Sequence, residues 1–202
     1  MKHSKKHIAL TFIMLISIYS CRKTSAQKWD QVIIDPKISQ NKAYKELNKE
    51  QEIFSFFELL KKPDSTSKRS SGVSYYIRKK NEQANNFPRN YNCRAYFFPP
   101  RADTLSINIG IGNGFGGNGF IINLKNNKFY TEAYYSTDVI IEGETKPTHK
   151  VIYQKLILDK ANYRIGDSLF GYIDFKSIET DKDNNQTNHS GKGYFRTKVK
   201  DF

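Results

Sequence analysis

TLSINIGI, the stretch from Thr104 to Ile111, alternates apolar residues with small or polar ones at a period of two. Its apolar members occupy every second position: Leu105, Ile107, Ile109 and Ile111. Because successive side chains of a β-strand point to opposite faces of a sheet, the pattern predicts a strand with one buried face. The same period returns on both sides of this stretch, and it decides the fold class.

Further strands are expected along the rest of the chain. Residues 120–125 and 128–135 alternate in the same way, and the link Asn126-Asn127 joins them. Because asparagine tolerates positive φ, this two-residue link predicts a tight β-hairpin. The other expected strands are 73–79, 92–98, 150–158, 168–176 and 193–199. About eight strands with no helices between them predict a mainly β fold, an antiparallel sandwich or barrel over residues 73–202.

A short motif favours the sandwich. Asp159-Lys160-Ala161-Asn162-Tyr163 resembles the D-x-A/G-x-Y corner that precedes a late strand in immunoglobulin-like sandwiches. The cysteine that follows in that family is replaced by Ile165, so the resemblance implies architecture and no function.

The segment before the strands is expected to hold one helix. Apolar residues recur at three- to four-residue spacing in 41–62, which predicts an amphipathic helix over 38–62 that Pro63 ends. The residues that carry this pattern are Tyr44, Leu47, Phe54, Phe57 and Leu60. Residues 63–72 are a loop by composition, and the polar residues 21–37 form a tether.

Composition bounds the class of protein. The chain has 202 residues, 38% hydrophobic and 26% charged, which excludes wholesale disorder. Its two cysteines exclude a disulfide-rich scaffold and a four-thiolate zinc site. The net charge of +13 favours an anionic partner.

The first twenty residues have the pattern of a secretory signal. Residues 1–7 carry three lysines and no acid, and an almost wholly apolar run follows from Ile8 to Tyr19. That run is shorter than the roughly 20 residues that span a bilayer as a helix. Removing residues 1–20 lowers the net charge to +10, because only the three lysines are lost.

The end of this run resembles the lipobox of bacterial lipoproteins, in the residues Ile18-Tyr19-Ser20-Cys21. The resemblance implies that residues 1–20 are a signal peptide, and that Cys21 receives a diacylglycerol thioether and an N-terminal acyl chain such as palmitate. Such chains hold a protein on a membrane durably. In a cell with two membranes, the non-acidic Arg22 favours the outer one. The alternative is ordinary cleavage after Ala26, which has the small residue Thr24 two positions before it.

A glycine-rich stretch follows the strand at 104–111. Residues 112–117 match G-x-G-x-x-G, but another strand pattern follows where a dinucleotide site requires a helix. We interpret the stretch as a hairpin tip whose Gly114, Phe115 and Gly116 contact a ligand closely. Residues 181–185 open like a calcium loop, yet Gln186 and Lys192 stand where an EF-hand requires glycine and glutamate. No metal and no cofactor are therefore predicted.

Candidate catalytic groups are few. Cys93 would need His149 or His189 beside it to act as a thiol nucleophile, but its strand pattern favours a buried, inert thiol. A glycoside hydrolase needs a pair of carboxylates, which could come from Glu142, Glu144, Asp174 and Glu179. No catalytic residue is assigned.

Aromatic residues are frequent, at 14%, and several stand as adjacent pairs within strands. One member of each pair must face outward, so Tyr76, Tyr96 and Tyr134 are candidate binding residues. The competing expectation is that the helix at 38–62 covers them.

The sequence thus predicts a lipid-anchored envelope protein that acts as a non-catalytic binding module. Its expected partner is another envelope protein, a toxin or effector that it neutralises as an immunity protein, or an anionic glycan; export argues against nucleic acid. The alternative function is a β-sandwich hydrolase or carbohydrate-binding protein that acts on envelope polysaccharide.

Overall fold

The structure is a computed structural model that describes residues 27–54, 60, 66–79, 91–98, 103–112, 115–139 and 146–201. The predicted signal peptide, Cys21 and Gly114 lie outside these residues. Within the described part of the chain, no helix has both the length and the apolar content of a membrane span.

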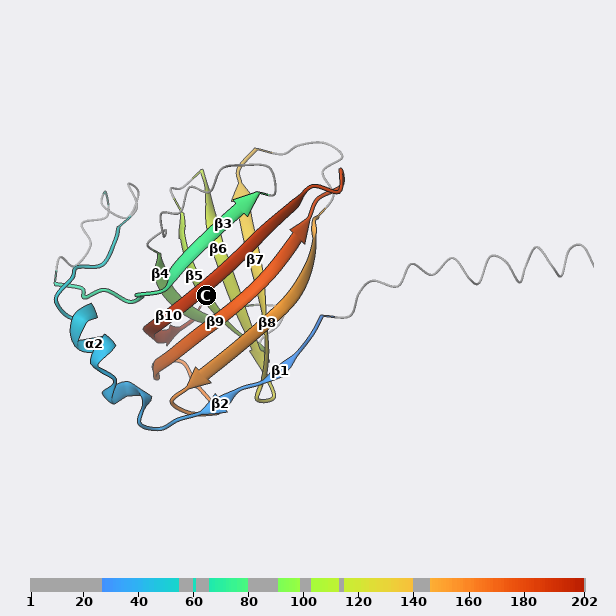
Figure 1. The fold of residues 1–202 in the computed structure, drawn as a ribbon. Helices are drawn as coiled ribbons and strands as arrows, with labels where there is room; N and C mark the ends of the chain where they lie inside the picture. The colour runs from blue at the N-terminus through green and yellow to red at the C-terminus, as the bar shows by residue number, and fades with distance from the viewer. Residues whose placement is uncertain are drawn as a thin grey trace, which may run out of the picture.

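The chain is mainly β, as predicted, and its strands form one mixed sheet (Figure 1). The strands are β1 (Asp30–Gln31), β2 (Ile33–Ile34), β3 (Ser74–Lys79), β4 (Asn92–Phe97), β5 (Leu105–Gly112), β6 (Gly116–Lys125), β7 (Lys128–Thr137), β8 (Thr148–Leu158), β9 (Ser168–Thr180) and β10 (Gln186–Lys200). Their order is β1-β7-β6-β5-β4-β10-β9-β8-β2, and β3 pairs with β10 beside this path.

Two details of the predicted sheet are wrong. Over the described residues it has ten strands rather than about eight, because β1 and β2 are only two residues long and leave no periodic signal. It is also not wholly antiparallel, because β4 pairs with β10, and β2 with β8, in parallel.

The core lies where the two halves of the sheet face each other. Figure 1 shows β8, β9 and β10 in front of β4 to β7. The buried cluster joins Ile107 and Phe120 from the rear half with Phe175 and Phe195 from the front half. The strand predicted at 104–111 corresponds to β5, and its inward residue Ile109 is completely buried.

The predicted hairpin is confirmed between β6 and β7. Asn126 and Asn127 have φ values of 50° and 58°, the left-handed region that a two-residue hairpin requires. At the motif that resembles an immunoglobulin corner, the Tyr163 hydroxyl donates to Asp159 Oδ1 over 2.7 Å. The same carboxylate oxygen accepts the Phe170 N–H over 2.9 Å, so the motif fixes the entry to β9.

The predicted helix is much shorter in the structure. A 3₁₀ turn, η1 (Ile38–Gln40), precedes α2 (Lys42–Leu47), whose N-cap Asn41 accepts the Ala43 N–H. Over residues 48–54 the prediction of helix is wrong, because this stretch pairs with 66–69 instead: Gln51 forms a bridge with Lys68. Backbone groups used in that pairing are not available to a helix. The rest of the predicted helix lies mostly outside the described residues.

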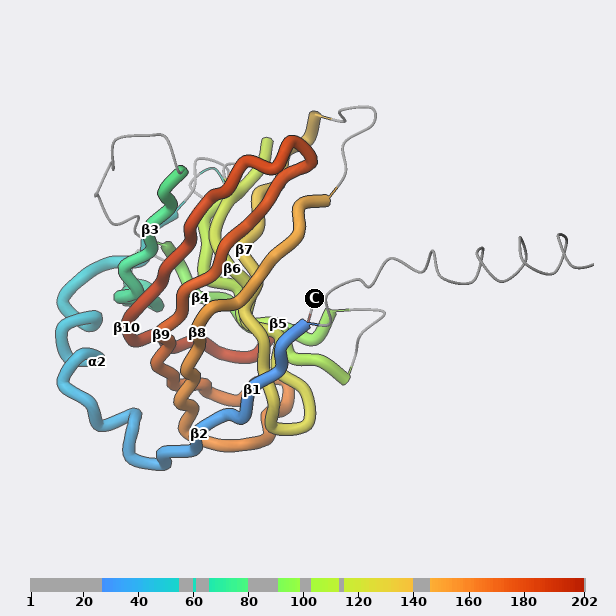
Figure 2. The backbone as a smooth tube through the Cα atoms, turned by 45° about the vertical axis from the view of Figure 1, so that its right-hand side comes forward, coloured from blue at the N-terminus to red at the C-terminus, as the bar shows by residue number. Residues whose placement is uncertain are grey.

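The N-terminal residues connect the two ends of the sheet. Residues 28–34, here called the strap, contain β1, which pairs with β7, and β2, which pairs with β8 (Figure 2). Val32 between them is buried, and its N–H donates to the Asn127 carbonyl over 3.1 Å. The strap therefore bridges the edge strands β7 and β8.

Gln154 on β8 fixes the strap from inside. Its side-chain oxygen accepts the Thr131 N–H of β7 over 3.0 Å. Its side-chain nitrogen donates to the Lys28 carbonyl and to Asp30 Oδ2, each over 2.9 Å. One buried amide thus connects β8, β7 and the strap.

Candidate functional site

Two of the predicted binding residues lie on one outward face of the rear half of the sheet. Tyr96 on β4 and Tyr134 on β7 are both partly exposed, and their strands are separated by β5 and β6. The predicted Tyr76 lies elsewhere, on β3, with 38% of its surface exposed.

Glycine makes room for Tyr134. A Cβ atom added at Gly110 would lie 2.0 Å from the Tyr134 hydroxyl, so the ring extends across β6 onto β5. There the hydroxyl donates to Asn108 Oδ1 over 3.1 Å. Burial raises the pKa of Tyr134, which keeps the hydroxyl protonated at neutral pH. The ring is therefore held in place on the outer face rather than free in solvent.

Tyr96 borders a row of basic side chains. It is the Cα partner of Lys200 in the parallel pairing of β4 with β10. Two residues earlier on each strand are Lys198 and Arg94, both exposed. Like charges on neighbouring strands weaken a sheet, so this arrangement is not explained by stability.

These side chains open into a groove, here called the cationic groove. Its basic lining residues are Lys68, Arg94, Arg196, Lys198 and Lys200. Glu52 is the only carboxylate among its described lining residues, and Phe54 and Phe170 supply partly exposed aromatic surface. The groove thus combines excess positive charge with aromatic rings, next to Tyr96.

The sheet's topology creates this groove. On one side, β10 pairs with β3 over residues 187–192 and with β4 only at 199–200. Between these two pairings, residues 70–72 supply backbone partners: Arg196 N–H donates to the Ser70 carbonyl over 2.8 Å, and Gly72 N–H to the Tyr194 carbonyl over 2.9 Å. The groove lies where β3 and β4 diverge.

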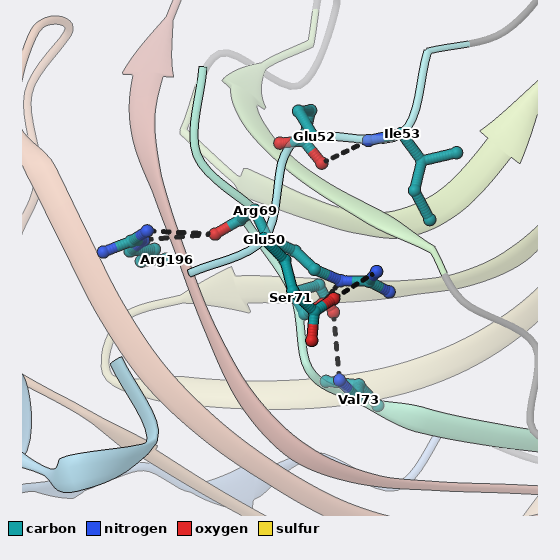
Figure 3. A network of polar contacts seen from close by, with 7 residues as sticks. All are labelled: Glu50, Glu52, Ile53, Arg69, Ser71, Val73 and Arg196. Carbon is teal, nitrogen blue, oxygen red and sulfur yellow. Dashed lines mark hydrogen bonds and ion pairs between the residues drawn. The ribbon is translucent and has the colours of Figure 1, made fainter. Parts of the chain in front are cut away.

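Arg196 is fixed within this arrangement (Figure 3). Its Nε and Nη2 atoms donate to the Arg69 carbonyl over 3.2 and 3.1 Å. Arg69 is itself buried, and it donates through Nε to the Ser71 carbonyl and through Nη1 to Glu50 Oε2. Burial lowers the pKa of Arg196. The ordinary pKa of an arginine is so high that the guanidinium is still charged at neutral pH.

The hairpin tip and Tyr76 line two other hollows. Phe115 and Gly116 border one together with Tyr135, whose ring is 77% exposed. Tyr76 borders another on the front half of the sheet, next to Ile152. The structure therefore does not unite the six predicted binding residues, and Gly114 is outside the described residues.

The candidate thiol catalyst does not have the required environment. Cys93 is 3% exposed in the hydrophobic core, and burial raises its pKa well above the ordinary value. A protonated thiol is a poor nucleophile. Asp174 forms an ion pair with Lys192 over 3.1 Å, and Glu142 lies outside the described residues.

The two histidines do meet, around Glu179, one of the carboxylates considered for glycoside hydrolysis. Glu179 Oε2 lies 3.8 Å from His149 Nε2 and 3.4 Å from His189 Nε2. His189 Nδ1 lies 2.7 Å from the Tyr75 hydroxyl, which donates to the Gly119 carbonyl. The Tyr75 hydroxyl has one proton to donate, so the direction of its bond with His189 Nδ1 depends on the tautomer of the imidazole.

Electrostatics in this cluster follow from burial and from the shared carboxylate. Burial lowers the pKa of His149, and contact with His189 lowers that of Glu179. The cluster joins β8, β9 and β10 to β3 and β6 inside the molecule. No three His, Cys, Asp or Glu side chains among the described residues are arranged to hold a metal ion.

The sequence contained a signal for the cationic groove that the aromatic pattern obscured. Arg196, Lys198 and Lys200 alternate with Phe195, Thr197 and Val199, which is the period of a strand with one basic face. The contributions of Lys68 and Arg94 come from other segments and depend on the topology. No protein-family model matches the chain, and neither a curated protein nor a solved structure does.

Proposed function

We propose that this chain is an exported, lipid-anchored cell-envelope protein that works as a non-catalytic binding module. The lipobox-like residues ending at Cys21 support the anchor. The partner is a protein, either a toxin or effector that the module neutralises or a component of an envelope assembly. We also infer that the two halves of the sheet act as the layers of a sandwich that presents the binding face.

One observation carries the binding role: the cationic groove continues into Tyr96 and the fixed ring of Tyr134 on a single outward face. Arginine and tyrosine dominate the energetics of protein interfaces, because they combine large contact area with directional hydrogen bonds. An arginine held by two hydrogen bonds and a tyrosine held by one lose little freedom on binding.

The test is capture of the full-length protein from its own envelope in mild detergent, followed by mass spectrometry. We expect a stoichiometric protein partner whose recovery falls at least tenfold with Tyr96→Ala. The matched control is Tyr76→Ala, which removes a partly exposed tyrosine from the other half of the sheet. Equal recovery with both variants contradicts the proposed face, and recovery of no protein contradicts the protein partner.

The mass of the mature N-terminus tests the anchor in the same sample. Acylated Cys21 is expected as the first residue. An unmodified chain that starts at Gln27 would instead establish cleavage after Ala26 and remove the anchor from the proposal.

The anionic glycan is the second candidate ligand, because aromatic rings and positive charge also suit a charged polysaccharide. Glycan binding with no protein partner would select it. Hydrolysis finds less support, since the Cys93 thiol is buried and protonated.

A further inference from the structure

Three lysines of the cationic groove have no carboxylate partner within the described part of the molecule. Some lysines elsewhere pair with carboxylates, as Lys125 does with Asp103 and Lys160 with Asp167. Among the described residues, no ion pair joins Lys68, Lys198 or Lys200 to a carboxylate. The groove therefore keeps a positive potential that an external anion can satisfy.

Arg196 has spare hydrogen-bonding capacity toward this groove. The guanidinium has five N–H donors, and the Arg69 carbonyl accepts from two of its nitrogens. The remaining donors belong to a planar group whose orientation is already fixed. Such a guanidinium is suited to a carboxylate, which it binds through two parallel hydrogen bonds.

The spacing of the basic side chains favours one kind of anion. Arg196, Lys198 and Lys200 alternate along one face of β10, so their Cα atoms repeat at roughly 6.8 Å. Acidic residues at alternate positions of an extended peptide repeat at the same distance. The aromatic rings of Phe54 and Phe170 add apolar surface for the residues between them.

We infer that the cationic groove receives an extended acidic segment of a protein partner, with Arg196 as the anchor for one of its carboxylates. This inference rests on the proposed binding function and adds the chemistry of the partner. Lys198 and Lys200 contact the neighbouring acids and mainly accelerate association, whereas the fixed Arg196 slows dissociation.

Poly-L-glutamate is the probe, titrated against the full-length protein in mild detergent, with polygalacturonate as a polyanion of different chemistry. We expect poly-L-glutamate to bind more tightly than polygalacturonate, and its affinity to fall about tenfold between 50 and 200 mM salt. The double variant Lys198→Glu/Lys200→Glu should weaken poly-L-glutamate binding at least tenfold.

A matched control makes the same change of charge away from the groove, with Lys155→Glu/Lys182→Glu at two exposed positions. It should leave binding within twofold of the wild type. Arg196→Lys keeps the charge but loses the planar fork, so dissociation should become several-fold faster. Unchanged far-UV circular dichroism and urea midpoints verify that each variant is folded.

Equal loss of binding in the groove variant and its control would overturn the inference, as would tighter binding of polygalacturonate. These outcomes are separate from a failure of the proposed function. A protein partner captured equally well by the groove variant refutes the acidic segment alone, whereas the absence of any protein partner refutes the proposed function.

Discussion

Replacing Gln154 with leucine should detach the strap before the sheet unfolds. Leucine keeps the volume but leaves the Thr131 N–H, in a residue 1% exposed, without its acceptor. An unsatisfied buried donor costs about 1–3 kcal/mol, and a neutral hydrogen bond contributes about 1 kcal/mol. The bond to the partly exposed Asp30 adds less, because water can replace it. The sum is about 3 kcal/mol, a large part of a typical domain stability of about 5–15 kcal/mol.

Tryptophan fluorescence can follow the strap by itself, because Trp29 is the only tryptophan of the chain. Its ring meets Tyr130 edge-on at 4.6 Å, so release of the strap changes its surroundings. In urea, the fluorescence transition of Gln154→Leu should precede the far-UV circular dichroism transition. The control is Lys155→Leu at the neighbouring exposed position. Coincident transitions, or a loss of stability below about 1 kcal/mol, would refute the reasoning.

Other predictions concern the site, the internal cluster and the thiol. Gly110→Ala should displace the Tyr134 ring and cost about 1–3 kcal/mol in urea unfolding, because the new methyl group overlaps the hydroxyl; an unchanged midpoint would contradict this contact. The free energy of unfolding should fall as pH drops below 6.5, because His149 takes up a proton more readily in the unfolded chain than in the folded one. It should fall again below pH 4.5, because Glu179 also has a lowered pKa in the folded state. Thermal midpoints against pH test both steps, and His149→Asn should remove the first. Cys93 should react with a thiol reagent only after unfolding; rapid labelling of the native protein would contradict its burial.

The sequence predicted those elements correctly whose residue pattern depends only on neighbouring residues. The alternation at 104–111 and the Asn126-Asn127 link predicted β5 and the hairpin, because both depend on local side-chain direction and backbone conformation. Helical spacing at 41–62 was misleading over residues 48–54. There, pairing of Gln51 with Lys68 overrides the local preference, and no local pattern records a partner 17 residues away.

The site was predictable only in its separate parts. Tyr96 and Tyr134 could be placed on an outward face from strand alternation alone. Their connection to Arg196 and Lys198 follows from the parallel pairing of β4 with β10, which the sequence does not indicate. For the same reason the sequence did not show that Glu179 contacts two histidines, because these contacts come from the register of neighbouring strands.

The strap also determines the order in which the molecule can be completed. Its residues leave the ribosome before the strands that they pair with: Asp30 pairs with Phe129, and Ile33 with Ile157, about 100 residues or more later in the chain. Contacts between such distant residues form slowly, because a long loop must close before they stabilise anything. The part of the fold that is synthesised first is therefore among the last to dock. A nascent chain that lacks β8 lacks one of the two strands with which the strap pairs. The fluorescence of Trp29, which lies in the strap, should therefore report a late step of folding.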